Sequence, residues 1–179
     1  MGRVLGIRQL VAHPDTPPAA ISRVTVQLAS SGPRELWLEY HVATAATLLL
    51  PEPKSPARAN QLWKTTCFEL FIQPVGSEQY AEFNFSPSFE WAAYEFEGYR
   101  RGRQEMPSHD PEIAIASPED RFFLAIEALP ELPAVPVMLG LSAVIEEKDG
   151  TKSYWALAHP AAKPDFHHPD SFALQLPPE

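Results

Sequence analysis

The residues 66–73 (TCFELFIQ) and 80–86 (YAEFNFS) decide the fold of this 179-residue chain. In both runs every second residue is apolar, and the residues between them include polar side chains. This period of two is typical of a β-strand with two distinct faces. The segment 74–78 (PVGSE), which lies between them, contains proline, glycine and serine, so the pair predicts a β-hairpin. One face of this hairpin is wholly apolar and belongs in a core; it carries Phe68, Leu70, Ile72, Ala81, Phe83 and Phe85.

The opposite face of the hairpin carries Glu69, Glu82 and Asn84. Side chains on neighbouring antiparallel strands lie roughly 5–8 Å apart, so the two carboxylates repel unless a cation, water or a ligand lies between them. A polyol suits this face, because carboxylates and an amide can exchange hydrogen bonds with vicinal hydroxyls while an aromatic ring covers the C–H side of the sugar. The alternative at this stage is a plain solvated outer face.

The rest of the chain repeats the β pattern on both sides of the hairpin. Further strands are expected at 21–29, 35–42, 90–99, 112–116, 121–129, 137–146, 153–158 and 171–176. Asp149-Gly150 between two of these runs is a strong hairpin signal. No amphipathic helix is evident, so the chain is expected to be an all-β, antiparallel, jelly-roll-like β-sandwich of about 9–11 strands. We expect an N-terminal arm over residues 1–20 and one domain over 21–177.

Composition limits the classes of function. The sequence has 45% hydrophobic residues, with 4 Trp, 5 Tyr and 10 Phe, which is typical of a folded chain. Its net charge of −9 disfavours binding to the phosphate backbone of nucleic acids. No apolar run is long enough to cross a bilayer, and the first residues do not resemble a signal peptide, so a cytoplasmic protein that binds neither membranes nor nucleic acid is expected. The single cysteine, Cys67, excludes an internal disulfide framework.

Two groups outside the hairpin, and one within it, offer other chemistry. His159, Asp165, His167 and His168 suggest a metal site, although adjacent residues of an extended chain point to opposite sides, so we expect no metal. Arg100, Arg101 and Arg103 form a basic cluster, from which one arginine could reach an anionic ligand group. In the hairpin itself, Glu69 and Glu82 could act as the acid and nucleophile of a glycan-acting enzyme.

The residues 62–72 (LWKTTCFELFI) and 80–85 (YAEFNF) resemble the DOMON-like superfamily, in the branch similar to family 9 carbohydrate-binding modules. In that branch a tryptophan precedes a strand of this form, and the next strand carries a polar residue before phenylalanine. The segments 153–155 (SYW) and 164–172 (PDFHHPDSF) resemble the closing tryptophan strand, the aromatic loop and the final strand. The likeness spans roughly residues 35–177.

This resemblance implies a β-sandwich that binds a sugar or a haem on one sheet face or rim. By position, Trp63 and Phe166 match the two rings that clamp a sugar, and Phe166 stands where those modules have tryptophan. Glu69 matches their sugar-binding carboxylate, and Glu82 occupies a position where they have an amide. Strand parity adds Asn84, and the loop at Phe166 adds His167.

The expected function is therefore non-catalytic binding of a small sugar-like ligand by Trp63, Glu69, Glu82, Asn84, Phe166 and His167, without a cofactor. One alternative is a b-type haem-binding redox module, with Met106 or Met138 and His109 or His159 as axial ligands. Another is the glycan-acting enzyme that uses Glu69 and Glu82. A third is an interaction domain that docks a protein partner through a sheet edge or an aromatic patch.

Overall fold

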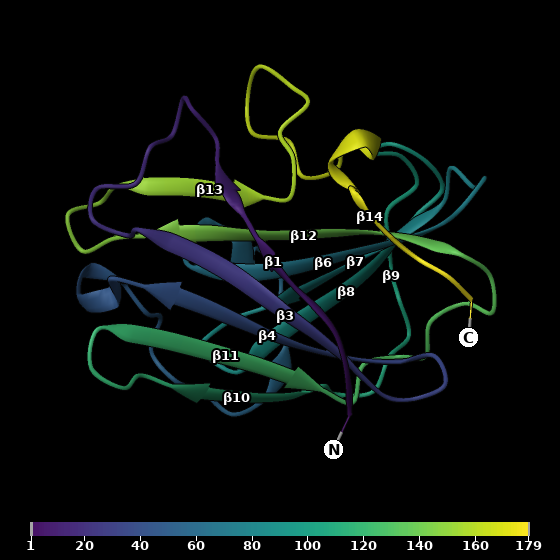
Figure 1. The fold of residues 1–179 in the computed structure, drawn as a ribbon, viewed down its shortest axis with the longest axis horizontal. Coiled ribbons are helices and arrows are strands. Elements are labelled where there is room, and N and C mark those ends of the chain that lie inside the picture. Colours follow the sequence, from purple (N-terminus) through teal and green to yellow (C-terminus); the bar gives the residue numbers. More distant parts are fainter. Residues whose placement is uncertain (1, 179) are drawn as a thin grey trace.

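Two β-sheets packed face to face make up the molecule (Figure 1), whose computed structural model describes residues 2–178. The five-stranded sheet contains, in spatial order, β1 (Arg3–Gln9), β3 (Arg23–Gly32), β4 (Glu35–Ala43), β11 (Arg121–Glu127) and β10 (Glu112–Ala116). The nine-stranded sheet contains β2 (Val11–Ala12), β13 (Lys152–Ala156), β12 (Val137–Glu146), β6 (Cys67–Pro74), β7 (Tyr80–Phe85), β8 (Glu90–Phe96) and β5 (Ala57–Arg58), with β14 (Leu174–Leu176) beside β12 and β9 (Gln104–Glu105) beside β8. Three short 3-10 turns, η1 (Ala45–Thr47), η2 (Leu62–Lys64) and η3 (Pro169–Ser171), lie in the connections.

The main core fills the space between the two sheets. Phe68 of β6 contacts Tyr40 of β4 and Phe122 of β11, with ring centroids 5.0 and 6.0 Å apart. Each such aromatic or aliphatic side chain contributes about 1.5–3 kcal/mol on burial, so the alternating pattern of the hairpin stabilises this packing. The expectation of an all-β antiparallel sandwich is confirmed; among the described strands, only β5 and β8 pair in parallel.

A second apolar cluster covers the outer face of the nine-stranded sheet. It contains Leu62, Cys67, Phe71, Tyr80, Ala92, Tyr94, Phe96 and Phe172. The η2 turn and the chain around Phe172 lie over this face, so the polar side of the β6–β7 hairpin is buried beneath loops. The alternative of a solvated outer face is therefore wrong, because long connections return across the sheet and cover it.

The N-terminal segment differs from the arm that we expect over residues 1–20. In the structure, β1 pairs with β3 at the edge of one sheet, and β2 pairs with β13 at the edge of the other. Gly6 interrupts the alternation of β1, at the point where the register with β3 shifts. Two side chains of β1 are mostly exposed, Val4 at 58% and Ile7 at 60%, so the strand lacks the clear apolar face by which the other strands can be recognised.

The other differences lie at strand ends and in very short strands. β8 ends at Phe96 rather than continuing to residue 99, because a turn closes with Arg101 N–H donating to the carbonyl of Gly98. Ser171 belongs to η3, and the last strand begins at Leu174. β2, β5 and β9 have two residues each, too few to produce a periodic pattern.

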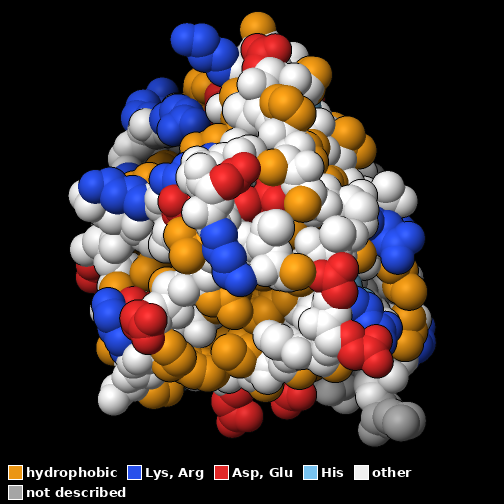
Figure 2. Space-filling view, turned by 90° about the vertical axis from the view of Figure 1, so that its left-hand side faces the viewer, with side chains coloured by type: hydrophobic (Ala, Val, Ile, Leu, Met, Phe, Trp, Pro, Cys, Tyr) orange, Lys and Arg blue, Asp and Glu red, His pale blue; other side chains and the backbone are white. Residues whose placement is uncertain are grey.

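No helix in residues 2–178 is long and apolar enough to cross a membrane. Figure 2 shows one end of the sandwich, where Lys and Arg side chains are densest along the upper left margin. Asp and Glu side chains lie nearer the middle and the lower edge of the same view, and apolar side chains gather in its lower half. On this side of the molecule the acidic net charge is therefore unevenly distributed, and part of the surface is basic.

Candidate functional site

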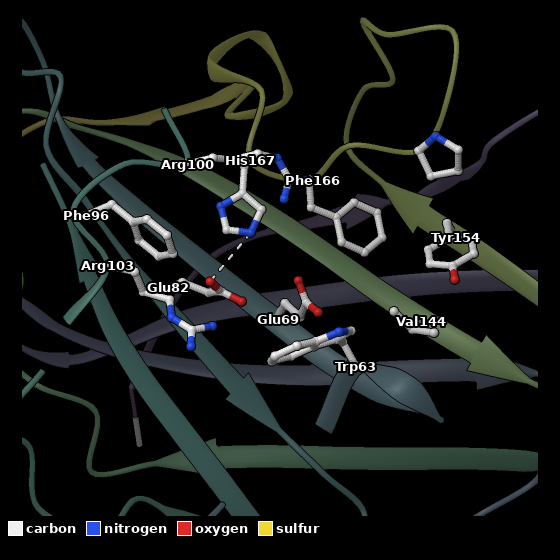
Figure 3. Close-up of a pocket in the computed structure, with 11 residues that line it drawn as sticks. Trp63, Glu69, Glu82, Phe96, Arg100, Arg103, Val144, Tyr154, Phe166 and His167 are labelled. Carbon is white, nitrogen blue, oxygen red and sulfur yellow. Dashed lines mark ion pairs between the residues drawn. The ribbon is translucent and has the colours of Figure 1, made fainter. Parts of the chain in front are cut away.

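A cavity of about 500 Å³ lies over the outer face of the nine-stranded sheet (Figure 3). Its floor is formed by β6, β7, β12 and β13, and its walls by η2 and by the segments around residues 96–103 and 164–167. The lining residues are Trp63, Glu69, Glu82, Phe96, Arg100, Arg103, Val144, Tyr154, Pro164, Phe166 and His167. Segments distant in sequence thus meet over the polar side of the central hairpin.

The floor of the cavity holds two buried carboxyl groups. Glu69 is 3% exposed and Glu82 is 5% exposed. In the register of β6 and β7, Glu69 lies opposite Asn84 and Glu82 lies opposite Phe71, so the two acids are diagonal neighbours on one face. Burial raises the pKa of Glu69 well above 4.5, and the negative charge of Glu82 acts in the same direction. Burial also raises the pKa of Glu82, which the Asn84 amide partly opposes.

The two acids differ in their hydrogen-bond partners. Asn84 Nδ2 donates to Glu82 Oε1 at 3.0 Å, and His167 Nε2 lies 3.6 Å from Glu82 Oε2. The Glu69 carboxyl receives no comparable pair of donors. Ser142, which lies opposite it on β12, slightly favours its charged form, but this buried hydroxyl has no partner at hydrogen-bonding geometry among the described residues. Hydrogen-bond donors stabilise a carboxylate, so Glu82 is the better hydrogen-bond acceptor, and Glu69 is the acid that is protonated more readily.

A chain of hydrogen bonds orients His167 toward Glu82. The backbone N–H of Arg100 donates to the Tyr80 hydroxyl at 3.2 Å, so that hydroxyl can donate its own hydrogen to His167 Nδ1, 2.8 Å away. This leaves the hydrogen of the neutral imidazole on Nε2, the nitrogen that faces Glu82. Burial lowers the pKa of His167 to about 4, and the nearby positive charge of Arg100 contributes to this shift. The ring is therefore a neutral donor at ordinary pH.

Asp165 holds the loop that carries His167 against the turn after β8. Its carboxylate accepts hydrogen bonds from the Tyr99 hydroxyl, from the Arg100 guanidinium at 2.7 Å and from the backbone N–H of His167 at 3.1 Å. These partners lower the pKa of Asp165. The Asp165 carboxylate thus joins two walls of the cavity.

Aromatic rings flank the acids. Figure 3 shows the carboxyl groups of Glu69 and Glu82 between the indole of Trp63 on one side and Phe166 with His167 on the other. Trp63 lies in η2, directly before β6, and is half-buried, as is Phe166. Tyr154 extends the aromatic wall, with its ring centroid 6.0 Å from that of Phe166. The cavity therefore combines ring faces with polar groups that exchange hydrogen bonds.

Five of the six site residues expected from the sequence line this one cavity: Trp63, Glu69, Glu82, Phe166 and His167. Asn84 does not line it. This side chain is fully buried on β7, and it positions the carboxyl group of Glu82.

Sequence reasoning missed four lining residues, Phe96, Val144, Tyr154 and Pro164. Strand parity could have found two of them, since Val144 and Tyr154 lie opposite each other in the β12–β13 hairpin that the Asp-Gly pair predicts. Of the arginine cluster, Arg100 and Arg103 line the cavity, while Arg101 pairs with Glu78 at 3.6 Å.

The residues considered for metal and haem ligation have other partners. His168 caps η3 by accepting from Asp170 N–H, and residues 2–178 contain no group of three or more His, Cys, Asp or Glu side chains arranged to hold a metal ion. His109 and His159 bond to the backbone carbonyls of Ala128 and Val11, each at 2.7 Å. Neither these histidines nor Met106 and Met138 line the cavity.

Comparisons with known proteins agree with the fold. No family model matches the sequence, and no curated protein matches it. Among solved structures, the chain is similar to a "putative carbohydrate-binding protein" from Bacteroides uniformis, with a TM-score of 0.64 and 15% sequence identity. The match covers 92% of this chain and 83% of the other. At this identity the likeness shows that the two chains share the β-sandwich fold.

Proposed function

We propose that this protein binds a small sugar or sugar-like polar molecule in the cavity between Trp63 and Phe166. The observation that carries the proposal is a half-exposed indole beside two buried carboxyl groups that differ in their hydrogen-bond partners. A sugar has an apolar C–H face that stacks on an aromatic ring, and each of its hydroxyls can both donate and accept hydrogen bonds. Glu82 accepts and a protonated Glu69 donates, which serves both needs.

The size of the cavity fits such a ligand. About 500 Å³ lies within the roughly 300–1,000 Å³ typical of small-molecule sites. Stacking with two or three hydrogen bonds corresponds to micromolar to millimolar affinity, about −8 to −4 kcal/mol. The description of the Bacteroides uniformis protein as carbohydrate-binding supports the same class of ligand.

We assign the chain, also as a proposal, to the DOMON-like superfamily in the branch similar to family 9 carbohydrate-binding modules. Support comes from the tryptophan before β6, the acidic β6–β7 hairpin and the aromatic loop at Phe166. Phe166 offers a smaller ring than tryptophan, so one side of the sugar clamp is weaker than in those modules. In this proposal the role of the cavity is recognition without chemical change.

Calorimetry with a panel of mono- and disaccharides tests the proposal. At least one sugar should bind, and Trp63→Ala should abolish the heat by removing the stacking surface. Trp37→Ala is the matched control, because Trp37 lies on β4 of the other sheet and does not line the cavity. Absence of heat with every sugar, or unchanged binding in Trp63→Ala, would defeat the proposal.

A second function is favoured by one specific observation, the unequal environments of Glu69 and Glu82. A pair of carboxyls with one protonated and one ionised member is what glycoside hydrolysis requires. Turnover of chromogenic glycosides that disappears in Glu69→Gln would favour the enzyme. Sugar binding without turnover favours recognition.

A further inference from the structure

Two arginines stand on one wall of the cavity and give it a positively charged side. Arg100 and Arg103 come from the turn and loop that follow β8, and both side chains line the cavity, as Figure 3 shows. Arg101, between them in sequence, lies against Glu78 outside the cavity and is 68% exposed. The loop thus brings two of its three arginines to the rim of the cavity, and all three remain exposed.

The two inward arginines differ in how far their charge is balanced. Arg100 is paired with Asp165, at 2.7 Å. Arg103 forms no ion pair with any described carboxylate; its guanidinium instead lies over the ring of Tyr94, 4.9 Å from the centroid. A guanidinium that stacks on a ring keeps its in-plane N–H groups free for a planar or tetrahedral anion.

Glu69 and Glu82 on the floor do not fully neutralise the positive charge of Arg100 and Arg103. Burial raises the pKa of both acids, and that of Glu69 is raised well above 4.5, so two full negative charges on the floor are disfavoured. Burial lowers the pKa of His167 to about 4, and the positive charges of Arg100 and Arg103 act in the same direction. The side of the cavity near the arginines is therefore a favourable place for a negative group.

We propose that the cavity selects a sugar that carries an anionic substituent, a carboxylate or a phosphate, and that Arg103 binds this group with Arg100 beside it. This inference rests on the proposed function, since the ring of the same ligand lies between Trp63 and Phe166. The hydroxyls then meet Glu69 and Glu82 on the floor, and the anion points toward the loop after β8.

Calorimetry at fixed ionic strength with matched ligand pairs tests the proposal. The pairs are glucose with glucuronate, galactose with galacturonate, and glucose with glucose 6-phosphate. At least one anionic member should bind roughly ten-fold or more tightly than its neutral parent, as a charge-assisted hydrogen bond in a partly enclosed site allows. The uronates and the phosphate ester distinguish the two kinds of anion.

Arg103→Gln should remove this preference, because it should weaken binding of the anionic member of each pair much more than binding of its neutral parent. Arg101→Gln, a change in the same loop outside the cavity, should keep the preference. Thermal unfolding of both variants checks that each remains folded.

Each other result has a definite meaning. If neutral sugars bind and their anionic partners bind equally or more weakly, or if Arg103→Gln preserves an anionic preference, this inference is overturned while the proposed function stands. If no member of any pair binds, this inference is overturned, and the wider panel of mono- and disaccharides decides the proposed function separately.

Discussion

At the scale of single residues, Glu69 and Glu82 show how position divides two identical side chains. Both are buried on one sheet face, but Glu82 has Asn84 and His167 as neighbours that can donate, and Glu69 has only the poorly placed Ser142 hydroxyl. Because donors favour the carboxylate, Glu82 loses its proton first as pH rises, and Glu69 keeps its own. The sequence predicts the shared face of the two acids, whereas the difference between them depends on the hydrogen bond from Asn84 to Glu82 and on the charges of Arg103 and Arg100 in the loop after β8.

The raised pKa of Glu69 predicts a loss of stability with rising pH. Its pKa is above 4.5 in the folded protein, so the folded state binds the proton more tightly than the unfolded chain does. The resulting stabilisation is complete below 4.5 and disappears as pH rises through the folded pKa. In Glu69→Gln there is no proton to lose, so the stability of the variant relative to wild type should increase from pH 4.5 to pH 8.

Urea unfolding at a series of pH values measures this difference. Glu95→Gln, at an exposed position of β8, serves as the control substitution. A variant whose stability relative to wild type falls with rising pH would show that Glu69 is held as a carboxylate.

His167 predicts a separate trend at lower pH. Its pKa falls from 6.5 in the unfolded chain to about 4 in the folded protein, so the folded state resists protonation. The stability that this contributes is present above pH 6.5 and is lost as pH falls from 6.5 toward 4. His167→Asn cannot be protonated and keeps an acceptor for the Tyr80 hydroxyl, so the slope in this window should be reduced. A direct check is the NMR titration of the imidazole, and a midpoint near 6.5 would contradict the prediction.

At the scale of elements, the hairpin and the central strands could be predicted because each has one continuous apolar face. β6 and β7 fulfil the expected parity, with Phe68 and Phe85 in the main core and Glu69 and Glu82 on the opposite side. β1 could not be recognised, since its exposed Val4 and Ile7 and the shift at Gly6 give no clear alternation. A strand with one apolar face can thus be predicted from its local periodicity. An edge strand such as β1 forms because a neighbouring strand offers hydrogen bonds, and this leaves no pattern in its own sequence.

Gly140 on β12 is required by the packing of the outer aromatic cluster. A Cβ at this position would lie 2.6 Å from Cδ1 of Phe172 and 3.1 Å from Cβ of Phe71. Gly140→Ala should therefore destabilise the protein by about 1–3 kcal/mol, because Phe172 has to move from its stacked position on Phe71. Urea unfolding of this variant gives the value.

A double-mutant cycle shows whether the clash with Phe172 is the cause. Phe172→Leu offers a more adaptable side chain, so the double variant should be more stable than the sum of the two single effects predicts. If the two single effects on the free energy of unfolding simply add, the destabilisation by Gly140→Ala does not arise from its contact with Phe172.

At the scale of the whole molecule, the cavity is a product of connections rather than of strands. Glu69 and Glu82 come from the sheet, but the aromatic and basic walls come from η2 and from the loops near Arg100 and Phe166. The resemblance to a known family made Trp63 and Phe166 candidates, with His167 beside Phe166 in the loop, and the structure brings them together through long-range contacts such as Tyr80 with His167. Such contacts leave no periodic signal, so the inward direction of Arg100 and Arg103 and the burial of Asn84 could not be predicted.

The two sheets are linked directly beneath the cavity, and this link yields the final prediction. Tyr40, fully buried on β4, donates its hydroxyl hydrogen across the sandwich to the backbone carbonyl of Glu69, at 2.6 Å. Burial raises the pKa of Tyr40 well above 10, so the hydroxyl remains a donor. Tyr40→Phe should cost about 1 kcal/mol by removing this bond while the ring keeps its packing against Phe68. Tyr154→Phe, which removes a hydroxyl without a hydrogen bond among the described residues, should cost much less in the same urea titration. Equal effects of the two substitutions would mean that the bond between the sheets adds nothing to the stability of the floor on which Glu69 lies.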